Sequence, residues 1–226
     1  PPRSTLFPYT TLFRSRDFVP VVLVSKSPMV VAVNNSVPAK SLAELIALDK
    51  AQPGKLAAAN EGAKTFGGMM SQALNLATGM RLLQVPYNGV APALQDTVAG
   101  RTQVVLVSSA AMSPFIKRGD LRPLAVTAGK RVIGLEDVPT LAEFYPGFEY
   151  VGWFALVAPA GTSVETVQRV NRDVNHVLGE ADVAQRLREL GAIHEGPATP
   201  QDTAQFFKEE RVRWAKLVKD IGLKPE

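Results

Sequence analysis

The sequence predicts an α/β fold with a largely parallel sheet. From Phe18 onward, short Val-rich segments bounded by turn residues alternate with segments whose apolar residues recur at helical spacing. Several helical segments open in capping-box spacing, with a hydroxyl residue followed three positions later by Glu, and several close at a glycine. Because parallel strands need a crossover of roughly a dozen residues, this alternation indicates βαβ units.

Taken in order, the elements divide the chain between Phe18 and Pro159. We expect strands at 18–25, 29–36, 55–60, 81–87, 102–109, 121–128 and 148–159. Between them we expect helices at 41–55, 65–79, 89–100, 113–119 and 140–147. Capping-box spacing marks the first and last of these helices, at Ser41/Glu44 and Thr140/Glu143.

The last third of the chain changes character and is predicted to be helical. A helix is expected to start at Thr162, capped with Glu165, and its apolar stripe consists of Val164, Val167, Val170, Val174, Val177 and Leu178. A second long helix is expected to begin after Thr199-Pro200 and to end at Gly222 and Pro225. A short strand is expected around His194. This tail suggests a chain that crosses into a second lobe and then returns.

Composition bounds the class of protein. The 226 residues are 46% apolar and 20% charged, which is typical of one large or two small globular domains. No apolar run reaches the roughly 18 residues of a membrane span, and the absence of cysteine excludes disulfides and thiolate sites. The net charge of +4 comes from scattered Lys and Arg without interleaved aromatic residues, which argues against nucleic-acid binding.

The sequence offers no catalytic or metal constellation. His176 and His194 lack partners at metal-ligand spacing, and no nucleophile elbow or phosphate loop is present. We therefore expect no cofactor, no metal and no enzymatic activity.

A recurring junction is the more informative feature. A strand, a short polar turn and a helix start follow one another at 57–68, 85–94 and 104–115. In a parallel sheet such turns gather at the carboxyl ends of the strands, where helix N-termini suit a carboxylate. Gly62 and Gly89 allow close approach of the backbone to a ligand. The alternative is that these are ordinary capped loops, which every fold of this class contains.

Six motifs in order carry a resemblance to a known family. They are VVAVNNSVPAKSLAELIALDKAQPGKL, VPYNGVAPALQDTVAGRTQVVLV, IKRGDLRPLAVTAGKR, LEDVPTLAEF, GFEYVGWFALVAPAGT and WAKLVKDIGLK. Between Arg16 and Glu226 the chain resembles the Bug-type, or TctC-like, extracytoplasmic solute receptors of tripartite tricarboxylate transporters. The resemblance implies a monomeric periplasmic receptor that delivers a small organic acid to membrane permease subunits.

The resemblance also implies a domain organisation. A type II periplasmic-binding-protein-like fold would have its second lobe at 31–155, and 16–30 with 156–226 would be the remnant of an incomplete first lobe. Residues 1–15 look like a translated sequencing adapter, so we interpret them as a non-native artefact standing where native residues belong. In the family, the native residues that they replace begin with a signal peptide.

The family pattern points to specific ligand-binding residues. We expect binding by backbone N–H groups at Gly62–Thr65 and Gly89–Ala91. The side chains expected to assist are those of Asn60, Tyr87, Asn88 and Ser108.

Several positions depart from the family pattern. Glu61 lies in the first loop, Asn88 stands where a lysine is common, and Val107 replaces a usual aspartate. These departures favour a monocarboxylate, or an amide-bearing or aromatic acid, over citrate.

Two other function classes stay open at this point. One is the effector-sensing domain of a transcription regulator with a similar lobed fold, which an upstream helix-turn-helix would reveal. The other is an α/β enzyme, which would need a pair of titratable groups converging in the cleft.

Overall fold

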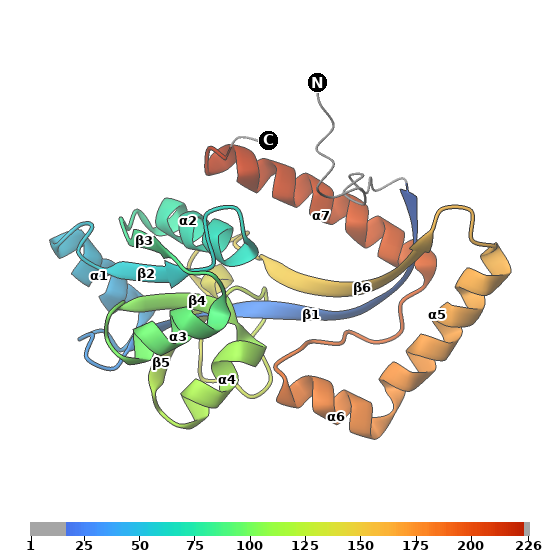
Figure 1. The fold of residues 1–226 in the computed structure, drawn as a ribbon, viewed down its shortest axis with the longest axis horizontal. Helices are drawn as coiled ribbons and strands as arrows, with labels where there is room; N and C mark the ends of the chain where they lie inside the picture. Colours follow the sequence, from blue (N-terminus) through green and yellow to red (C-terminus); the bar gives the residue numbers. More distant parts are fainter. Residues whose placement is uncertain (1–16, 224–226) are drawn as a thin grey trace.

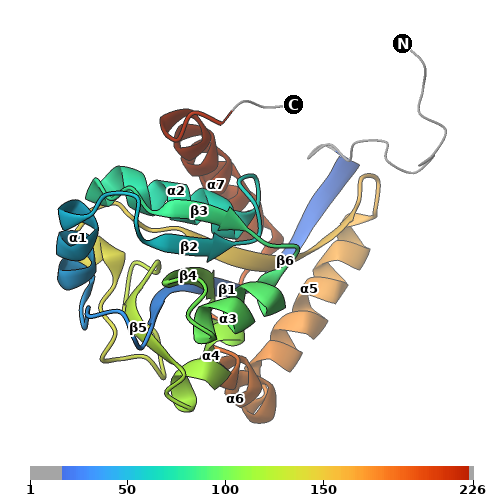
Figure 2. The same cartoon turned by 60° about the vertical axis from the view of Figure 1, so that its left-hand side comes forward.

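Residues 17–223 are described by the computed structural model, in which helices cover both faces of a sheet (Figures 1 and 2). The strands are β1 (Phe18–Asn34), β2 (Ala57–Asn60), β3 (Leu83–Pro86), β4 (Val104–Ser108), β5 (Leu121–Val126) and β6 (Val151–Pro159). The helices are α1 (Leu42–Ala51), α2 (Phe66–Thr78), α3 (Val90–Val98), α4 (Ser109–Lys117), α5 (Val164–Gly179), α6 (Ala181–Glu189) and α7 (Pro200–Asp220). The interpretation of residues 1–15 as an artefact lies outside the described residues.

The sheet is mixed, so the prediction of a largely parallel sheet was wrong. Its order is β3-β2-β4-β1-β5, with β6 pairing β1. β2 runs parallel to β3 and β4, whereas β1 runs antiparallel to β4, β5 and β6. The βαβ rule applies to β2, β3 and β4, which are joined by α2 and α3. β1 enters from the opposite direction and lies between two later strands.

β1 is one strand of 17 residues, where the sequence had suggested two. Through Pro28 it pairs with β6, and from Met29 it pairs with β4 and β5. Pro28 therefore stands where the partners change, at a place where a strand tolerates a residue without an N–H. β1 and β6 run side by side from the sheet towards α5 (Figure 1).

Side chains along β1 and β4 point alternately to the two faces of the sheet, so these strands contribute to two buried clusters, one on each face. Val31 and Leu106 belong to the first, which α1 and α2 cover. Val30 and Val107 belong to the second, which α3 and α4 cover. Helix α7 reaches the first cluster through Leu217.

Several helix boundaries differ from the prediction. Helix α5 takes Ser163 as its N-cap instead of Thr162, because the Ser163 hydroxyl accepts the Thr166 amide at 3.2 Å. The helix expected at 140–147 is a single 3-10 turn, Leu141–Glu143, although its capping box is present. Helix α4 spans Ser109–Lys117 and not 113–119. Helix α6 was not predicted from the sequence. The strand expected near His194 is a single β-bridge between Lys26 and Ile193.

Candidate functional site

The three junctions singled out in the sequence meet at one edge of the sheet. β2, β3 and β4 are mutually parallel, and Asn60 at the end of β2 pairs with Pro86 at the end of β3. Each strand is followed within a few residues by a helix start. The starts of α2, α3 and α4 therefore gather at the carboxyl ends of these strands, where open α/β sheets bind ligands.

In the first junction, the expected ligand-binding side chains shape the loop. Asn60 is buried; its Oδ1 accepts the Gly62 amide at 2.8 Å, and its Nδ2 donates to Gln84 at 2.8 Å. The Thr65 hydroxyl donates to the Gly62 carbonyl at 2.7 Å and accepts the Gly68 amide at 3.1 Å, which caps α2. A Cβ on Gly68 would lie 1.9 Å from the Gly62 carbonyl oxygen, so only glycine fits there. Asn60 and Thr65 thus position the backbone of this loop.

In the second junction, the Tyr87 side chain already has a partner. Its hydroxyl donates to Asp96 at 2.8 Å, and Asp96 also pairs with Arg101. Burial, reinforced by the hydrogen bond to Asp96, raises the pKa of Tyr87. The Tyr87 amide donates to the Asn60 carbonyl at 2.8 Å, which ties the first two junctions together.

The start of α3 is the open one. Its N-cap is Gly89, at φ +139°, and no side chain caps the helix. Asn88 and Ala91 on either side of Gly89 are exposed. First-turn amides have no acceptor within their own helix, so those of α3 are free to meet an anion.

In the third junction, Ser108 caps α4, since its hydroxyl accepts the Ala111 amide at 3.4 Å. The next residue, Ser109, is buried and donates to the Gly191 carbonyl at 2.8 Å. The junction is thereby fixed to the segment that follows α6.

Glu61 gives the first loop an uncompensated acid. Burial raises the pKa of its carboxyl group, and within the described residues it makes no hydrogen bond or ion pair. Its Oε2 lies close to the backbone of Gly67, where a Cβ would approach it to 3.3 Å. Residues 17–223 contain no group of three His, Asp or Glu side chains arranged to hold a metal ion.

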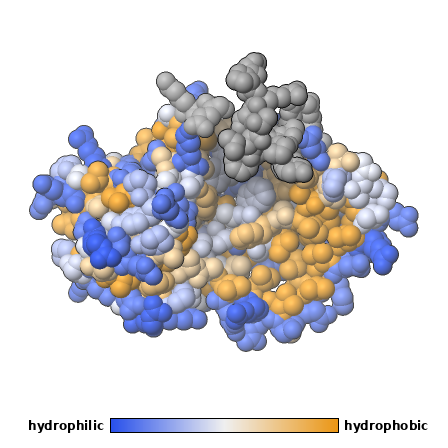
Figure 3. Space-filling model, viewed as in Figure 1, coloured by the Kyte–Doolittle hydropathy of each residue, from blue (hydrophilic) through white to orange (hydrophobic). Residues whose placement is uncertain are grey.

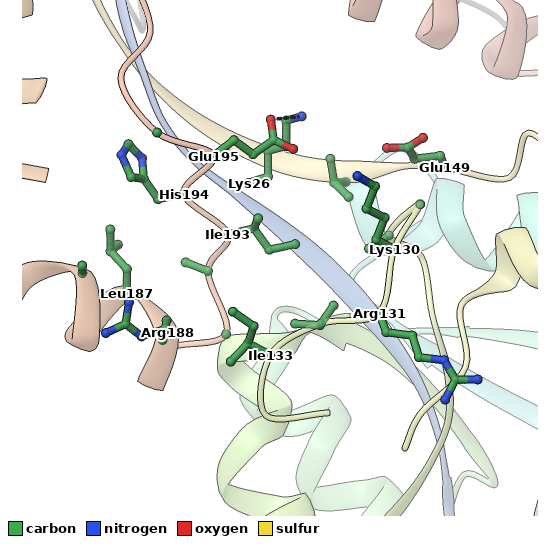
Figure 4. A pocket seen from close by; sticks show the side chains of 18 residues that line it. Lys26, Lys130, Arg131, Ile133, Glu149, Leu187, Arg188, Ile193, His194 and Glu195 are labelled. Atoms are coloured by element: carbon green, nitrogen blue, oxygen red, sulfur yellow. Dashed lines mark ion pairs between the residues drawn. The ribbon is translucent and has the colours of Figure 1, made fainter. Parts of the chain in front are cut away.

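A cavity of about 850 Å³ lies farther along the same edge, beyond β1, and the sequence reasoning missed it. Its walls come from residues 128–133, from α6 with residues 191–196, and from Lys26 and Glu149 (Figure 4). None of the eight predicted ligand-binding residues lines it. Four segments far apart in sequence build it, so no local motif marks it.

The described part of the chain has no helix of a length and apolarity suited to crossing a membrane.

Residues 3–223 match the family model described as "Tripartite tricarboxylate transporter family receptor". BugT of Bordetella pertussis is 34% identical over 220 residues, which are 96% of this chain and 66% of BugT.

Solved structures are similar as well, and two of them illustrate the match. One is "R. palustris Rpa4515 with adipate", with a TM-score of 0.83 and 35% identity over 93% of this chain and 70% of that one. The other is "periplasmic binding protein BugD", with a TM-score of 0.80 and 29% identity over 92% of this chain and 71% of that one. The chain spans about two thirds of the length of the curated relatives it matches.

Proposed function

Because the chain belongs to the receptor family of the tripartite tricarboxylate transporters, we propose that it binds a small organic carboxylate outside the cytoplasm and delivers it to membrane permease subunits. Family membership confirms the resemblance drawn from the six motifs. The fold of the similar solved proteins likewise confirms the predicted periplasmic-binding-protein class. The match favours a receptor over the regulator and the enzyme.

One observation carries the binding site: α3 begins without a side-chain cap, at the edge where α2 and α4 also begin. Three helix N-termini at one edge add their partial positive charges, and the amides of Gly89–Ala91 supply donors. Asn60, Gly62 and Thr65 support the site by fixing the adjacent loop. Ser108 fixes the third helix start, and Asn88 and Tyr87 flank the donors.

The ligand class follows from charge. The similar protein Rpa4515 was solved with adipate, which supports a carboxylate. Glu61 adds a partly buried negative group beside the helix starts, and like charges repel more strongly where water is excluded. A monocarboxylate, or an amide-bearing or aromatic acid, therefore suits this site better than citrate.

The remaining parts of the proposal rest on the family. The name of BugD as a periplasmic binding protein supports a periplasmic location. The second lobe at 31–155, the remnant of the first lobe at 16–30 and 156–226, and the monomeric state stay predictions. A cleft receptor closes because its ligand contacts both lobes.

Carboxylate binding can be tested by placing an acid among the α3 amides. Ala91→Asp adds a carboxylate to the exposed first turn of α3, where it would cap the amides and repel a ligand anion. In amide NMR spectra at millimolar adipate and benzoate, we expect shifts at residues 62–67 and 89–91. Ala91→Asp should weaken this binding about tenfold or more.

The matched control is Ala181→Asp, which adds the same charge to the exposed first turn of α6. This variant should bind as the unaltered chain does. If neither acid moves the junction amides, or if the two variants bind equally, the carboxylate site is not at the α3 start.

A further inference from the structure

The cavity beyond β1 has the size and position of a second binding site. Its volume of about 850 Å³ falls within the range of small-molecule sites, about 300–1,000 Å³. Lys26 and Ile193 exchange backbone hydrogen bonds of 2.8 Å, so residues 191–196 lie along β1 and form a fixed wall. Facing this wall is the loop 128–133, which follows β5 (Figure 4).

The floor of the cavity is apolar and belongs to the core. Ala128, Val132 and Val151 are 2–4% exposed and belong to the second core cluster, against which Ile193 packs. Leu187 on α6 adds a wall, and Ile133 is 65% exposed at the rim. An apolar body entering here would displace water from these side chains, and the burial of apolar surface favours binding.

The charges at the rim favour one negative charge on the ligand. Lys26 is paired with Glu195 at 2.6 Å, and Arg131 is paired with Glu143 at 2.9 Å. Lys130 and Arg188 have no ion pair or hydrogen-bonding partner for their side chains among the described residues, and neither does the carboxylate of Glu149. Two unpaired cations and one unpaired carboxylate leave an excess of one positive charge.

Lys130 is the better placed of the two cations. It extends from its loop towards the level of Lys26 and Glu149 (Figure 4). The Glu149 carboxylate lies against Gly129, the residue before Lys130, where a Cβ would come within 2.5 Å of its Cδ. A dianion would meet the repulsion of Glu149, whereas a monoanion would complete the pairing of the rim.

We propose that this cavity binds an organic monoanion with an apolar or aromatic body, whose charge pairs with Lys130 and whose body packs on Ile133, Leu187 and Ile193. This site is separate from the helix starts at residues 62–67 and 89–91. Its walls belong both to the loop after β5 and to α6, so an occupant would contact the two sides at once and stabilise their relative position.

Calorimetry with 2-naphthoate tests the proposal, because this probe joins one carboxylate to an apolar body. We expect 2-naphthalenemethanol, which lacks the charge, to bind about tenfold more weakly or worse. Lys130→Gln should weaken 2-naphthoate binding about tenfold, as loss of a charge-assisted hydrogen bond does. Ile133→Ser should weaken both probes, whereas Lys55→Gln, which removes an exposed lysine elsewhere, should change neither.

The outcomes separate this site from the proposed carboxylate site. Unchanged 2-naphthoate affinity in Ala91→Asp together with a loss in Lys130→Gln supports the cavity. The reverse pattern places the probe at the helix starts and overturns the cavity proposal while supporting the receptor site. Equal affinity for the acid and the alcohol, or no binding of either, also overturns it, provided that thermal melting shows each variant folded.

Discussion

The sheet region, residues 29–126, and the mainly helical region of β6, α5 and α6, residues 151–190, are built from equally regular elements but differ in burial. The sheet region holds most of both core clusters. In the helical region, α5 buries only Asn171 and Leu178, and α6 buries no residue. The space-filling view shows a broad apolar surface on the side where β6 and α5 lie (Figure 3). Exposed apolar side chains there include Phe154, Leu156, Val157, Val164 and Val177.

This difference shows that the features that form a helix are distinct from the packing that buries it. Helix α5 has a side-chain N-cap at Ser163 and a regular apolar stripe, yet Val164 is 72% exposed and Val177 52% exposed. Apolar spacing and capping are properties of the local sequence, whereas burial needs a partner. Among the described residues, the stripe is covered at Val167, Val170, Val174 and Leu178 but little at Val164 and Val177.

The largest contrast should come from truncating one apolar side chain in each region. Leu106 is fully buried at the centre of β4, so Leu106→Ala should destabilise the fold by about 2–5 kcal/mol. Val177→Ala removes a half-exposed side chain from a helix, where alanine is the better helix former, and should change stability by less than about 0.5 kcal/mol. Urea denaturation of both variants measures the two changes. Similar losses would show that α5 is buried in solution.

A smaller effect is expected where α7 joins the sheet region. Glu210 is buried and accepts hydrogen bonds from Trp214 Nε1 at 2.9 Å and from Arg213 at 2.8 Å. The Trp214 ring packs against Phe66 and Tyr150, with centroids 5.4 and 5.8 Å away. Glu210→Ala leaves the indole N–H without its acceptor and should cost about 1–3 kcal/mol.

Two further variants serve as controls for the Glu210→Ala measurement. Glu210→Gln keeps an acceptor for Trp214 and should retain part of the stability. Glu209→Ala changes the neighbouring exposed residue and should have almost no effect in the same denaturation experiment. A Glu210→Ala protein as stable as the parent would show that α7 is not held by this contact.

The smallest effect concerns pH, at the exposed pair between Arg131 and Glu143. Hydrogen bonds from Arg131, and then the bond from the Thr140 amide, lower the pKa of Glu143 from 4.5 to about 2. A lowered pKa in the folded state gives stability that is present above pH 4.5 and is lost as the pH falls towards about 2. The difference in stability between the parent and Glu143→Gln should therefore shrink over this range in urea denaturation. A constant difference would show that the pair contributes no charge-dependent stability.

Local signals predicted the local structure well. Ser41 marks the start of α1, and Thr65 and Gly79 mark the two ends of α2, where the structure has them. The errors arose where distant segments decide the outcome. The sequence predicted two strands, at 18–25 and 29–36, but pairing with β6 along the first part and with β4 and β5 along the second keeps β1 continuous.

The features of the candidate site also divide into those that local sequence predicted and those that depend on the tertiary structure. The three junctions were visible because each is a contiguous turn before a helix, and the structure brings their strands together. The hydrogen bonds of Tyr87 to Asp96 and of the Thr65 hydroxyl to the Gly62 carbonyl were not visible, because they depend on side-chain geometry. The cavity needed Lys26, the loop 128–133 and residues 191–196 in one place, which only the tertiary fold provides.

The continuity of β1 also affects the order in which the strands can pair during folding. Met29 pairs with Ser108, and Phe18 pairs with Pro159, so the partners of this strand are synthesised long after it. β2 and β3, by contrast, pair across a single helix. Contacts between residues far apart in sequence slow folding because their loop entropy must be lost first. The strand that runs through the middle of the molecule is thus among the last to be enclosed, and its Val-rich edges stay open to other chains until β4 and β6 arrive.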